Sequence, residues 1–413
     1  MNLVFIEVNR NNMTIINYDQ IPLIKINNAK LEMITKYNID NYVNTNDLQK
    51  EIVYYYFFYE NLKRYHNDTN LYYIFEFYDP NLLKDFDIKD FIPCNIIKMI
   101  INKKIRLIIN NTGHGYHTIV NDLYKNIILE YNVDPNFIFL SSESYDMGNE
   151  ITKIANHYKL PKIHYSWNTE FEKIVREQID GIEFNKVKNI DKIFLNFNGR
   201  QTHHRTLLIF LLKSLNLLQY GYVSYNKNLY DHESALTYYM NIFKDNAELI
   251  KILKENQENI LSIENMVLDN CNTQDKFKIT SNNLYEKSLL SLVTETNFYG
   301  KSLYNENIDN GRILSEKTFK PIAMKHPFII VSNKNFLDCI RSLGYKTFYP
   351  YIDESYDLID DDAERLLAIV KEIERLTKMS KDEQEIFIKF TNDICEYNYQ
   401  VLKNKKVFTR VIF

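Results

Sequence analysis

The sequence predicts an α/β fold made of two units, each a parallel sheet with helices on both faces. Short apolar runs, typical of buried strands, alternate along the chain with longer segments typical of helices. This alternation implies parallel strands joined by crossover helices. It pauses at a polar stretch near residues 180–189 and then restarts. A chain of 413 residues is long enough for two domains of the usual size.

The first unit is predicted over residues 1–185. It is expected to begin with strands, because residues 1–30 alternate apolar and polar side chains. Further strands are predicted at short apolar runs that end in polar or turn residues, namely 71–77, 105–109, 137–140 and 162–165. Helices are predicted between the strands, at 51–65, 95–101, 118–131 and 150–157.

The second unit is predicted over residues 186–380 and is followed by a last segment, 381–413. Its strands are expected at the apolar runs 192–197, 220–225, 289–293, 328–331 and 346–348. Its helices are expected at 206–218, 234–259, from Ser315 to the strand at 328–331, 336–343 and 361–377, with a final helix at 381–402. Ser315 is the predicted N-cap of its helix, because its hydroxyl accepts a hydrogen bond from a first-turn amide.

Composition describes an ordinary globular chain, with 45% hydrophobic and 25% charged residues. The net charge of −4 gives no overall basic field that would favour nucleic acid as a partner. Four cysteines are scattered without zinc-site spacing and no signal peptide is evident, so we expect reduced thiols and a cytoplasmic location. No apolar run approaches the roughly 20 residues of a membrane span, and none is expected.

The start of the predicted Ser315 helix carries an unusual charge pattern. A helix N-terminus already has free amides and a partial positive charge, and here Lys317 and Lys320 add two ammonium groups beside Glu316. This arrangement suits a bound anion such as a diphosphate. The alternative is a solvated helix start with an ion pair between Glu316 and Lys320.

Ligands of open α/β sheets bind beyond the carboxyl ends of strands, which draws attention to three further loops. The first is NFNGRQTHHR at 196–205, where Arg200 and Arg205 flank a tight turn and could hold phosphates. The second is TET at 294–296. The third includes His114, after the predicted strand 105–109, and Glu143, after 137–140; either is a candidate general base. The alternative for each residue is a solvent-exposed loop position without a role.

Several common motifs are absent or carry no weight. The sequence has no GxxxxGK[ST] and no GxGxxG, so neither a P-loop nor the dinucleotide fingerprint is present. The DFD triplet at 85–87 matches a D-x-D signature that binds a metal ion and a nucleotide, but it follows no strong strand, and we regard it as a chance match. No metal site is therefore predicted.

Two motifs together resemble a group of GT-B glycosyltransferases found in bacteriophage and giant-virus genomes. One is SEKTFKPIA at 315–323 with HPF at 326–328, preceded by LVTET at 292–296. The other is the 196–205 loop, which is similar to an N-R-x-x-R-x-H-R pattern, although Gly199 stands where that pattern often has Arg. The resemblance covers about residues 190–380 and extends to the first half only in its α/β rhythm.

The resemblance implies two Rossmann-like domains that face each other across a cleft, with the donor in the second and the acceptor in the first. It implies that the C-terminal helix packs back on the N-terminal domain. Glu316 would bind the ribose hydroxyls, and Arg200, Arg205, Lys317 and Lys320 the diphosphate of a UDP- or GDP-sugar, with no essential metal or other cofactor. The predicted donor-binding residues are Asn198, Arg200, His203, Arg205, Glu295, Ser315, Glu316, Lys317, Thr318 and Lys320.

The resemblance leaves the acceptor open. A glycan or protein acceptor is the first hypothesis. Glycosylation of modified bases in viral DNA is an alternative, which the near-neutral charge disfavours. A non-catalytic nucleotide-binding or structural protein is the third, which the intact Arg200, Glu316 and Lys317 disfavour. Inverting and retaining chemistry both remain open, and a base such as His114 or Glu143 is required if the enzyme inverts.

Overall fold

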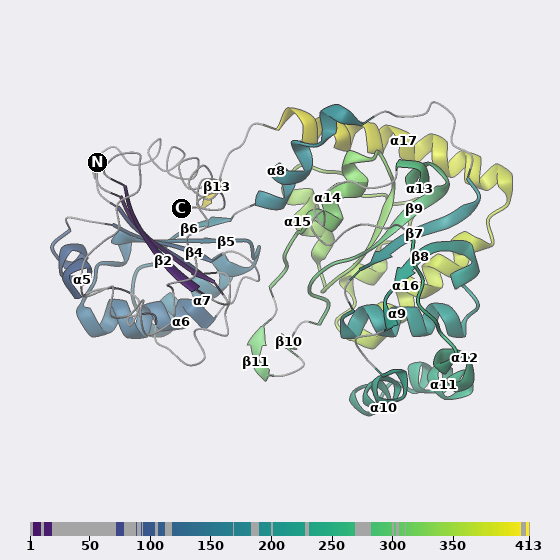
Figure 1. Ribbon diagram of the computed structural model, residues 1–413, viewed down its shortest axis with the longest axis horizontal. Coiled ribbons are helices and arrows are strands. Elements are labelled where there is room, and N and C mark those ends of the chain that lie inside the picture. The colour runs from purple at the N-terminus through teal and green to yellow at the C-terminus, as the bar shows by residue number, and fades with distance from the viewer. Residues whose placement is uncertain are drawn as a thin grey trace. The chain divides into compact units, whose positions relative to one another are not determined.

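The chain forms two compact units. The computed structural model describes residues 3–9, 12–18, 72–77, 88, 92, 94–103, 106–111, 118–167, 169–182, 190–199, 201–227, 231–268, 282–299, 301–302, 305–309, 311–405 and 410–412. The first unit comprises Met1–Thr169, Ile308–Ile313 and Val407–Phe413. The second comprises Glu170–Asn307 and Leu314–Lys406. Each unit contains its own sheet (Figure 1).

The sheet of the first unit has the strand order β13-β6-β5-β4-β3-β1-β2. Its strands are β1 (Leu3–Asn9), β2 (Asn12–Tyr18), β3 (Tyr72–Phe77), β4 (Arg106–Asn111), β5 (Ile138–Ser142), β6 (His164–Trp167) and β13 (Arg410–Ile412). The five strands from β6 to β1 are parallel, and the two edge strands, β13 and β2, are antiparallel to their neighbours. The helices described in this unit are α5 (Cys94–Ile101), α6 (Thr118–Leu123), its π-helical continuation η2 (Tyr124–Leu129) and α7 (Met147–Tyr158).

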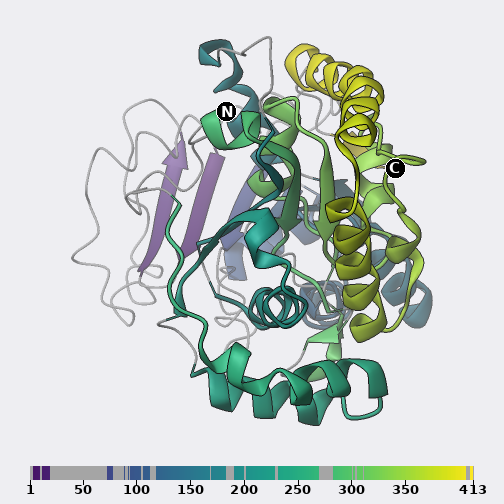
Figure 2. The same ribbon diagram turned by 90° about the vertical axis from the view of Figure 1, so that its right-hand side faces the viewer.

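The sheet of the second unit is wholly parallel and has the order β12-β9-β7-β8. Its strands are β7 (Lys192–Asn198), β8 (Gly221–Tyr225), β9 (Ser288–Thr294) and β12 (Phe328–Val331). Helices α9 (His203–Ser214) and α16 (Asp362–Thr377) pack together on one face, and α13 (Asn282–Glu286) and α14 (Glu316–Ala323) lie on the other (Figures 1 and 2). The strands β10 (Lys301–Ser302) and β11 (Asn305–Asp309) form a separate two-stranded sheet.

The remaining helices lie outside these layers or link them. They are α8 (Glu170–Arg176), α10 (His232–Ile242), α11 (Ala247–Glu255), α12 (Gln257–Leu261), α15 (Phe336–Ser342) and α17 (Lys381–Asn404). Helix α17 packs against α8 and α14. The predicted packing of the C-terminal helix on the N-terminal domain, the predicted domain bounds and the predicted cleft stay predictions. None of the described helices is long and apolar enough to cross a membrane.

The core of the second unit explains why these segments fold as they do. Phe194, Leu290 and Ile329 occupy adjacent parallel strands and are fully buried. Each such side chain stabilises the fold by about 1.5–3 kcal/mol relative to its exposure to water. Strands covered on both faces read as continuous apolar runs. For that reason the apolar-run pattern located β7, β9 and β12 to within one or two residues.

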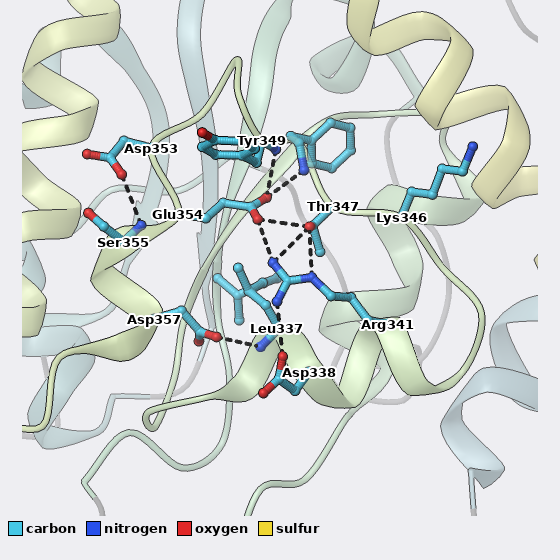
Figure 3. A network of polar contacts seen from close by, with 12 residues as sticks. Leu337, Asp338, Arg341, Lys346, Thr347, Tyr349, Asp353, Glu354, Ser355 and Asp357 are labelled. Atoms are coloured by element: carbon cyan, nitrogen blue, oxygen red, sulfur yellow. Dashed lines mark hydrogen bonds and ion pairs between the residues drawn. The ribbon is translucent and has the colours of Figure 1, made fainter.

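The α/β prediction with parallel sheets is confirmed, and two element predictions are wrong. Residues 346–348 form no strand, because side chains take two of the amides: Phe348 N–H donates to Glu354 Oε1 at 2.5 Å and Lys346 N–H donates to Asn398 Oδ1 at 2.8 Å. Figure 3 shows the Glu354 carboxylate with its further partners Thr347 and Arg341. The single helix predicted over 234–259 is three helices, α10 to α12. One break is at Asn246, whose side chain accepts the Leu249 amide at 2.9 Å and so caps α11. The predicted helix 51–65 and the triplet 85–87 lie outside the described residues.

Candidate functional site at the carboxyl edge of the second sheet

The strand order of the second unit marks one edge as a binding site. Its strands follow each other in the chain as β7, β8, β9 and β12. In the sheet, β8 lies on one side of β7, whereas β9 and then β12 lie on the other side. The direction of the chain across the sheet therefore reverses between β7 and β9. Ligands of open α/β sheets bind beyond the carboxyl ends of the strands at such a reversal. Among the described parallel strands of the first unit, the order β1-β3-β4-β5-β6 has no reversal.

Buried polar side chains join the carboxyl ends of β7 and β9. Asn196 Nδ2 donates to the Leu292 carbonyl at 2.6 Å, and the Asn198 side-chain amide donates to Asn196 Oδ1. Thr294 Oγ1 donates to Asn198 Oδ1 at 2.6 Å. The side chains of Asn196, Asn198 and Thr294 are all buried. Because each polar group meets a partner, the strand ends are held in one arrangement.

The start of α9 is attached to the end of β9. His204 Nε2 donates to the Glu295 carbonyl at 2.9 Å, and Arg205 Nη2 donates to the carbonyls of Thr294 and Glu295 at 3.1 and 3.2 Å. Since a carbonyl only accepts, the His204 proton lies on Nε2, and Nδ1 faces the Thr202 hydroxyl at 3.3 Å. Burial, and then the neighbouring Arg205, hold the pKa of His204 well below its usual value, so this imidazole is neutral.

The loop after β9 is fixed by an aromatic stack. The Phe298 ring is nearly parallel to the His204 ring, 5.6 Å away, and its centroid lies 4.6 Å from the Arg365 guanidinium. Arg365 is only 1% exposed and donates to the carbonyls of Phe298 at 2.8 Å and Ser332 at 3.0 Å. This arginine on α16 thus ties the loop after β9 to the loop after β12.

The Glu295 carboxylate caps α14. It is fully buried and accepts from the Ser315 amide at 3.1 Å, the Ser315 hydroxyl at 2.6 Å, the Thr318 hydroxyl at 2.5 Å and the Thr296 amide at 3.2 Å. Ser315 is itself the N-cap, as predicted, and its hydroxyl accepts from the Lys317 amide at 3.3 Å. A negative charge at a helix N-terminus is favourable because the free amides there carry partial positive charge.

Glu316 and Lys317 lie side by side on the first turn of α14. Lys317 Nζ is 3.0 Å from Glu316 Oε1 and donates to Ser315 Oγ at 2.9 Å. The side chain of Lys317 is 27% exposed and that of Glu316 is 11% exposed. A carboxylate and an ammonium therefore lie together at the carboxyl edge of the second sheet, where the strand order reverses, and each has a defined position. The alternative interpretation of this helix start had paired Glu316 with Lys320, whereas the structure pairs Glu316 with Lys317.

The structure brings seven of the predicted donor-binding residues to this edge. They are Asn198, Arg205, Glu295, Ser315, Glu316, Lys317 and Thr318. Lys320 is half-buried one turn further along α14. His203 begins α9, half-buried against the Tyr238 ring at 4.8 Å, and burial lowers its pKa. Arg200 lies outside the described residues. The donor-binding roles themselves stay predictions.

Of the two predicted bases, only Glu143 is described. It follows β5 in the first unit, is buried, and its carbonyl accepts from Trp167 Nε1 at 3.1 Å. His114 lies outside the described residues. Among the described residues, no group of three or more His, Cys, Asp and Glu side chains is arranged to hold a metal ion.

Sequence reasoning missed Asn196, Phe298 and Arg365. Asn196 had a signal, because it alternates with Asn198 inside an otherwise apolar strand, where a buried amide needs a specific partner. Phe298 and Arg365 had none. Each is an ordinary residue of a loop or of an amphipathic helix, and only the fold brings them together.

Comparisons with known proteins find likenesses among solved structures. No protein-family model matches the chain, and no curated protein matches it. Among solved structures, this chain is similar to trehalose-6-phosphate synthase OtsA, with 11% sequence identity and a TM-score of 0.38. The similarity covers 80% of this chain and 70% of the OtsA chain. These values are too low for the likeness to establish a family for the chain.

Proposed function

We propose that this chain is a GT-B glycosyltransferase that moves a sugar from a nucleotide-sugar donor, such as a UDP- or GDP-sugar, to a glycan or protein acceptor without an essential metal. The second unit binds the donor. One observation carries the proposal: Glu316 and Lys317 are held side by side at the start of α14, on the edge where the strand order reverses. This agrees with the motif resemblance at 315–323.

The chemistry of this edge suits a nucleoside diphosphate. The Glu316 carboxylate accepts hydrogen bonds from a vicinal diol such as that of ribose. In this proposal Arg200 contacts the diphosphate, as the sequence predicts. The ammonium groups of Lys317 and, one turn on, of Lys320 neutralise phosphate oxygens. Because these cations are positioned before the reaction, they stabilise the charge that develops on the leaving diphosphate. In this proposal His114 or Glu143 of the first unit takes the acceptor proton.

Ligand-induced stabilisation tests the proposal. Melting temperatures are measured with UDP, GDP, CDP and dTDP over a concentration series, each in the presence of EDTA. At about 100 times its dissociation constant, the cognate diphosphate adds roughly 2.7 kcal/mol to the free energy of unfolding. Unchanged melting with every nucleotide contradicts the proposal, and stabilisation that disappears with EDTA contradicts its metal independence.

The Lys317→Ala variant tests the site. Loss of a charge-assisted phosphate contact weakens nucleotide binding by roughly 10- to 100-fold, while the melting temperature without ligand stays near that of the wild type, since Lys317 is partly exposed. Lys378→Ala is the matched control, because this exposed lysine is the C-cap of α16 and pairs with Glu374 of the same helix. Wild-type affinity in Lys317→Ala excludes the residue from the site.

A further inference from the structure

We propose that Glu295 is a positioning residue of the donor site: its buried carboxylate fixes the first turn of α14, and through it Glu316 and Lys317, and never touches the donor. This inference rests on the proposed function and deepens it. It also revises the role expected from the sequence, in which Glu295 was one of the donor-binding residues.

The carboxylate of Glu295 has no capacity left for a ligand. An ionised carboxylate offers about four lone-pair sites, two on each oxygen. Oε1 accepts from the Ser315 amide at 3.1 Å and the Thr318 hydroxyl at 2.5 Å. Oε2 accepts from the Ser315 hydroxyl at 2.6 Å and the Thr296 amide at 3.2 Å. The side chain is fully buried, and four donors from this chain fill its four sites.

The backbone of Glu295 is held as firmly as its side chain. Its amide donates to the Val331 carbonyl of β12 at 3.1 Å. Its carbonyl accepts from His204 and Arg205 of α9. One residue therefore connects the start of α9, the end of β12 and the start of α14. A group fixed on three sides is suited to setting the position of α14 relative to the sheet edge.

The Ser315 hydroxyl passes this positioning on to Lys317. Because its hydrogen is committed to Glu295 Oε2, its oxygen presents lone pairs in other directions. Those lone pairs accept from the Lys317 amide at 3.3 Å and from Lys317 Nζ at 2.9 Å. Lys317 Nζ in turn lies 3.0 Å from the Glu316 carboxylate. A chain of hydrogen bonds thus leads from Glu295 to both residues that face the donor.

Thr318 separates a positioning role from direct contact. Its side chain is fully buried and its hydroxyl donates to Glu295. The proposal therefore also revises Thr318, which the sequence predicted to bind the donor, to a residue that supports Glu295. Thr318→Val keeps the shape of the side chain and removes this bond. If Glu295 acts by positioning α14, loss of the Thr318 bond weakens nucleotide binding. If Glu295 binds the donor itself, loss of that bond does not.

The experiment measures dissociation constants for UDP and GDP by calorimetry, at a temperature where every variant is fully folded by circular dichroism. We expect Glu295→Gln and Thr318→Val each to weaken binding roughly five- to tenfold. The double variant is expected to lose less affinity than the sum of the two single losses, because both changes act on the hydrogen bonds of one carboxylate. Thr318→Ser, which keeps the hydroxyl, is expected to bind as the wild type does.

Thr391→Val is the matched control. Thr391 is 1% exposed on α17, and its hydroxyl bonds to the backbone of its own helix, to Phe387 at 2.8 Å. It is expected to leave nucleotide binding unchanged. Wild-type affinity in Thr318→Val, additive losses in the double variant, or an equal loss in Thr391→Val each overturn the positioning role alone. Absence of any nucleotide binding by the wild type overturns the proposed function and this inference with it.

Discussion

Arg205 shows how burial changes what a single residue can do. The sequence suggested a diphosphate ligand, because arginine matches phosphate geometry. In the fold the residue is only 4% exposed, and its Nη2 donates to the carbonyls of Thr294 and Glu295. If the guanidinium is removed, the Thr294 carbonyl loses this partner, whereas the Glu295 carbonyl still accepts from His204 Nε2. An unsatisfied buried acceptor is costly.

We therefore expect Arg205→Met to lower the free energy of unfolding by about 1–3 kcal/mol, because the Thr294 carbonyl loses its bond to Arg205. Urea denaturation measures this loss. Lys213→Met, a partly exposed change at the other end of α9, is the control and is expected to change stability by less than about 0.5 kcal/mol. Wild-type stability in Arg205→Met together with lost nucleotide binding would instead favour the diphosphate role.

His204 gives stability a pH dependence. Burial, and next the charge of Arg205, hold its pKa well below the usual 6.5. The unfolded chain therefore binds a proton that the folded chain does not as pH falls below about 6.5. The stability contributed by His204 is present above that pH and is lost as pH falls toward the depressed folded pKa.

Comparison with His204→Gln isolates this contribution, since glutamine keeps an Nε2 donor for the Glu295 carbonyl and does not titrate. We expect the difference in unfolding free energy, wild type minus variant, to decrease as pH is lowered from about 7.5 to about 5. Urea titrations at a series of pH values measure it. A difference that stays constant over this range contradicts a neutral, buried His204.

At the scale of elements, local signals were readable and distant partners were not. The N-cap at Ser315 follows from its own residue type and the helix after it. The partner of that cap, Glu295, lies 20 residues earlier in the chain, and no local pattern connects the two. For the same reason the strand predicted at 346–348 failed: Glu354 and Asn398 take the amides that a neighbouring strand would have taken.

Helix α15 is another element whose start depends on a distant residue. Its N-cap, Asn335, provides no side-chain cap. Instead Asp357 accepts from the Phe336 amide at 2.9 Å and from the Leu337 amide at 3.1 Å, and Figure 3 shows the bond from Leu337. Burial raises the pKa of this carboxyl from 3.8 to about 6, although both amides act to lower it. Burial is therefore the larger effect.

This raised pKa predicts a pH dependence opposite to that of His204. Between about pH 4 and 6, the folded chain keeps the Asp357 proton while the unfolded chain has lost it, so raising the pH favours unfolding. The stability that the raised pKa of Asp357 contributes to the folded chain is fully present below about pH 4 and is lost as pH rises through about 6. We expect the unfolding free energy of the wild type, relative to Asp357→Asn, to fall over this range. A difference that rises with pH would show a depressed pKa instead.

At the scale of the whole molecule, the alternation of strands and helices predicted two α/β units, because each strand–helix rhythm depends mainly on local pattern. The path of the chain between the units was not predictable. Residues 308–313 belong to the first unit, although the chain before and after them belongs to the second. Ile313 forms a β-bridge with Ser144, and the Tyr145 amide donates to the Arg312 carbonyl at 2.8 Å. Such contacts join segments more than 160 residues apart.

An ion pair between Arg312 and Asp146 holds residues 308–313, here called the return segment because the chain returns in it to the first unit. Arg312 Nε donates to both Asp146 oxygens, at 3.1 and 2.9 Å, its Nη2 also contacts Asp146, and its amide donates to Asp146 Oδ2 at 2.9 Å. The guanidinium also lies 4.7 Å from the centroid of the Tyr145 ring. The two side chains are only 15% and 21% exposed, so the pair is screened less than a surface pair.

We expect Asp146→Ala to loosen the return segment without unfolding either sheet. Amide hydrogen exchange, followed by mass spectrometry, is expected to rise roughly tenfold or more in peptides covering residues 143–146 and 311–313, since about 1.5–3 kcal/mol of charge-assisted bonding is lost. Peptides covering β7 and β9 are expected to be unchanged. Asp134→Ala is the control, because its pair with the exposed Lys103 is a surface contact of the first unit. Equal exchange in Asp146→Ala and the control would mean that the backbone contacts alone hold the segment. Faster exchange in β9 would mean that the ion pair also stabilises the second unit. The chain leaves that unit before the return segment and re-enters it at Leu314, one residue before the Ser315 cap.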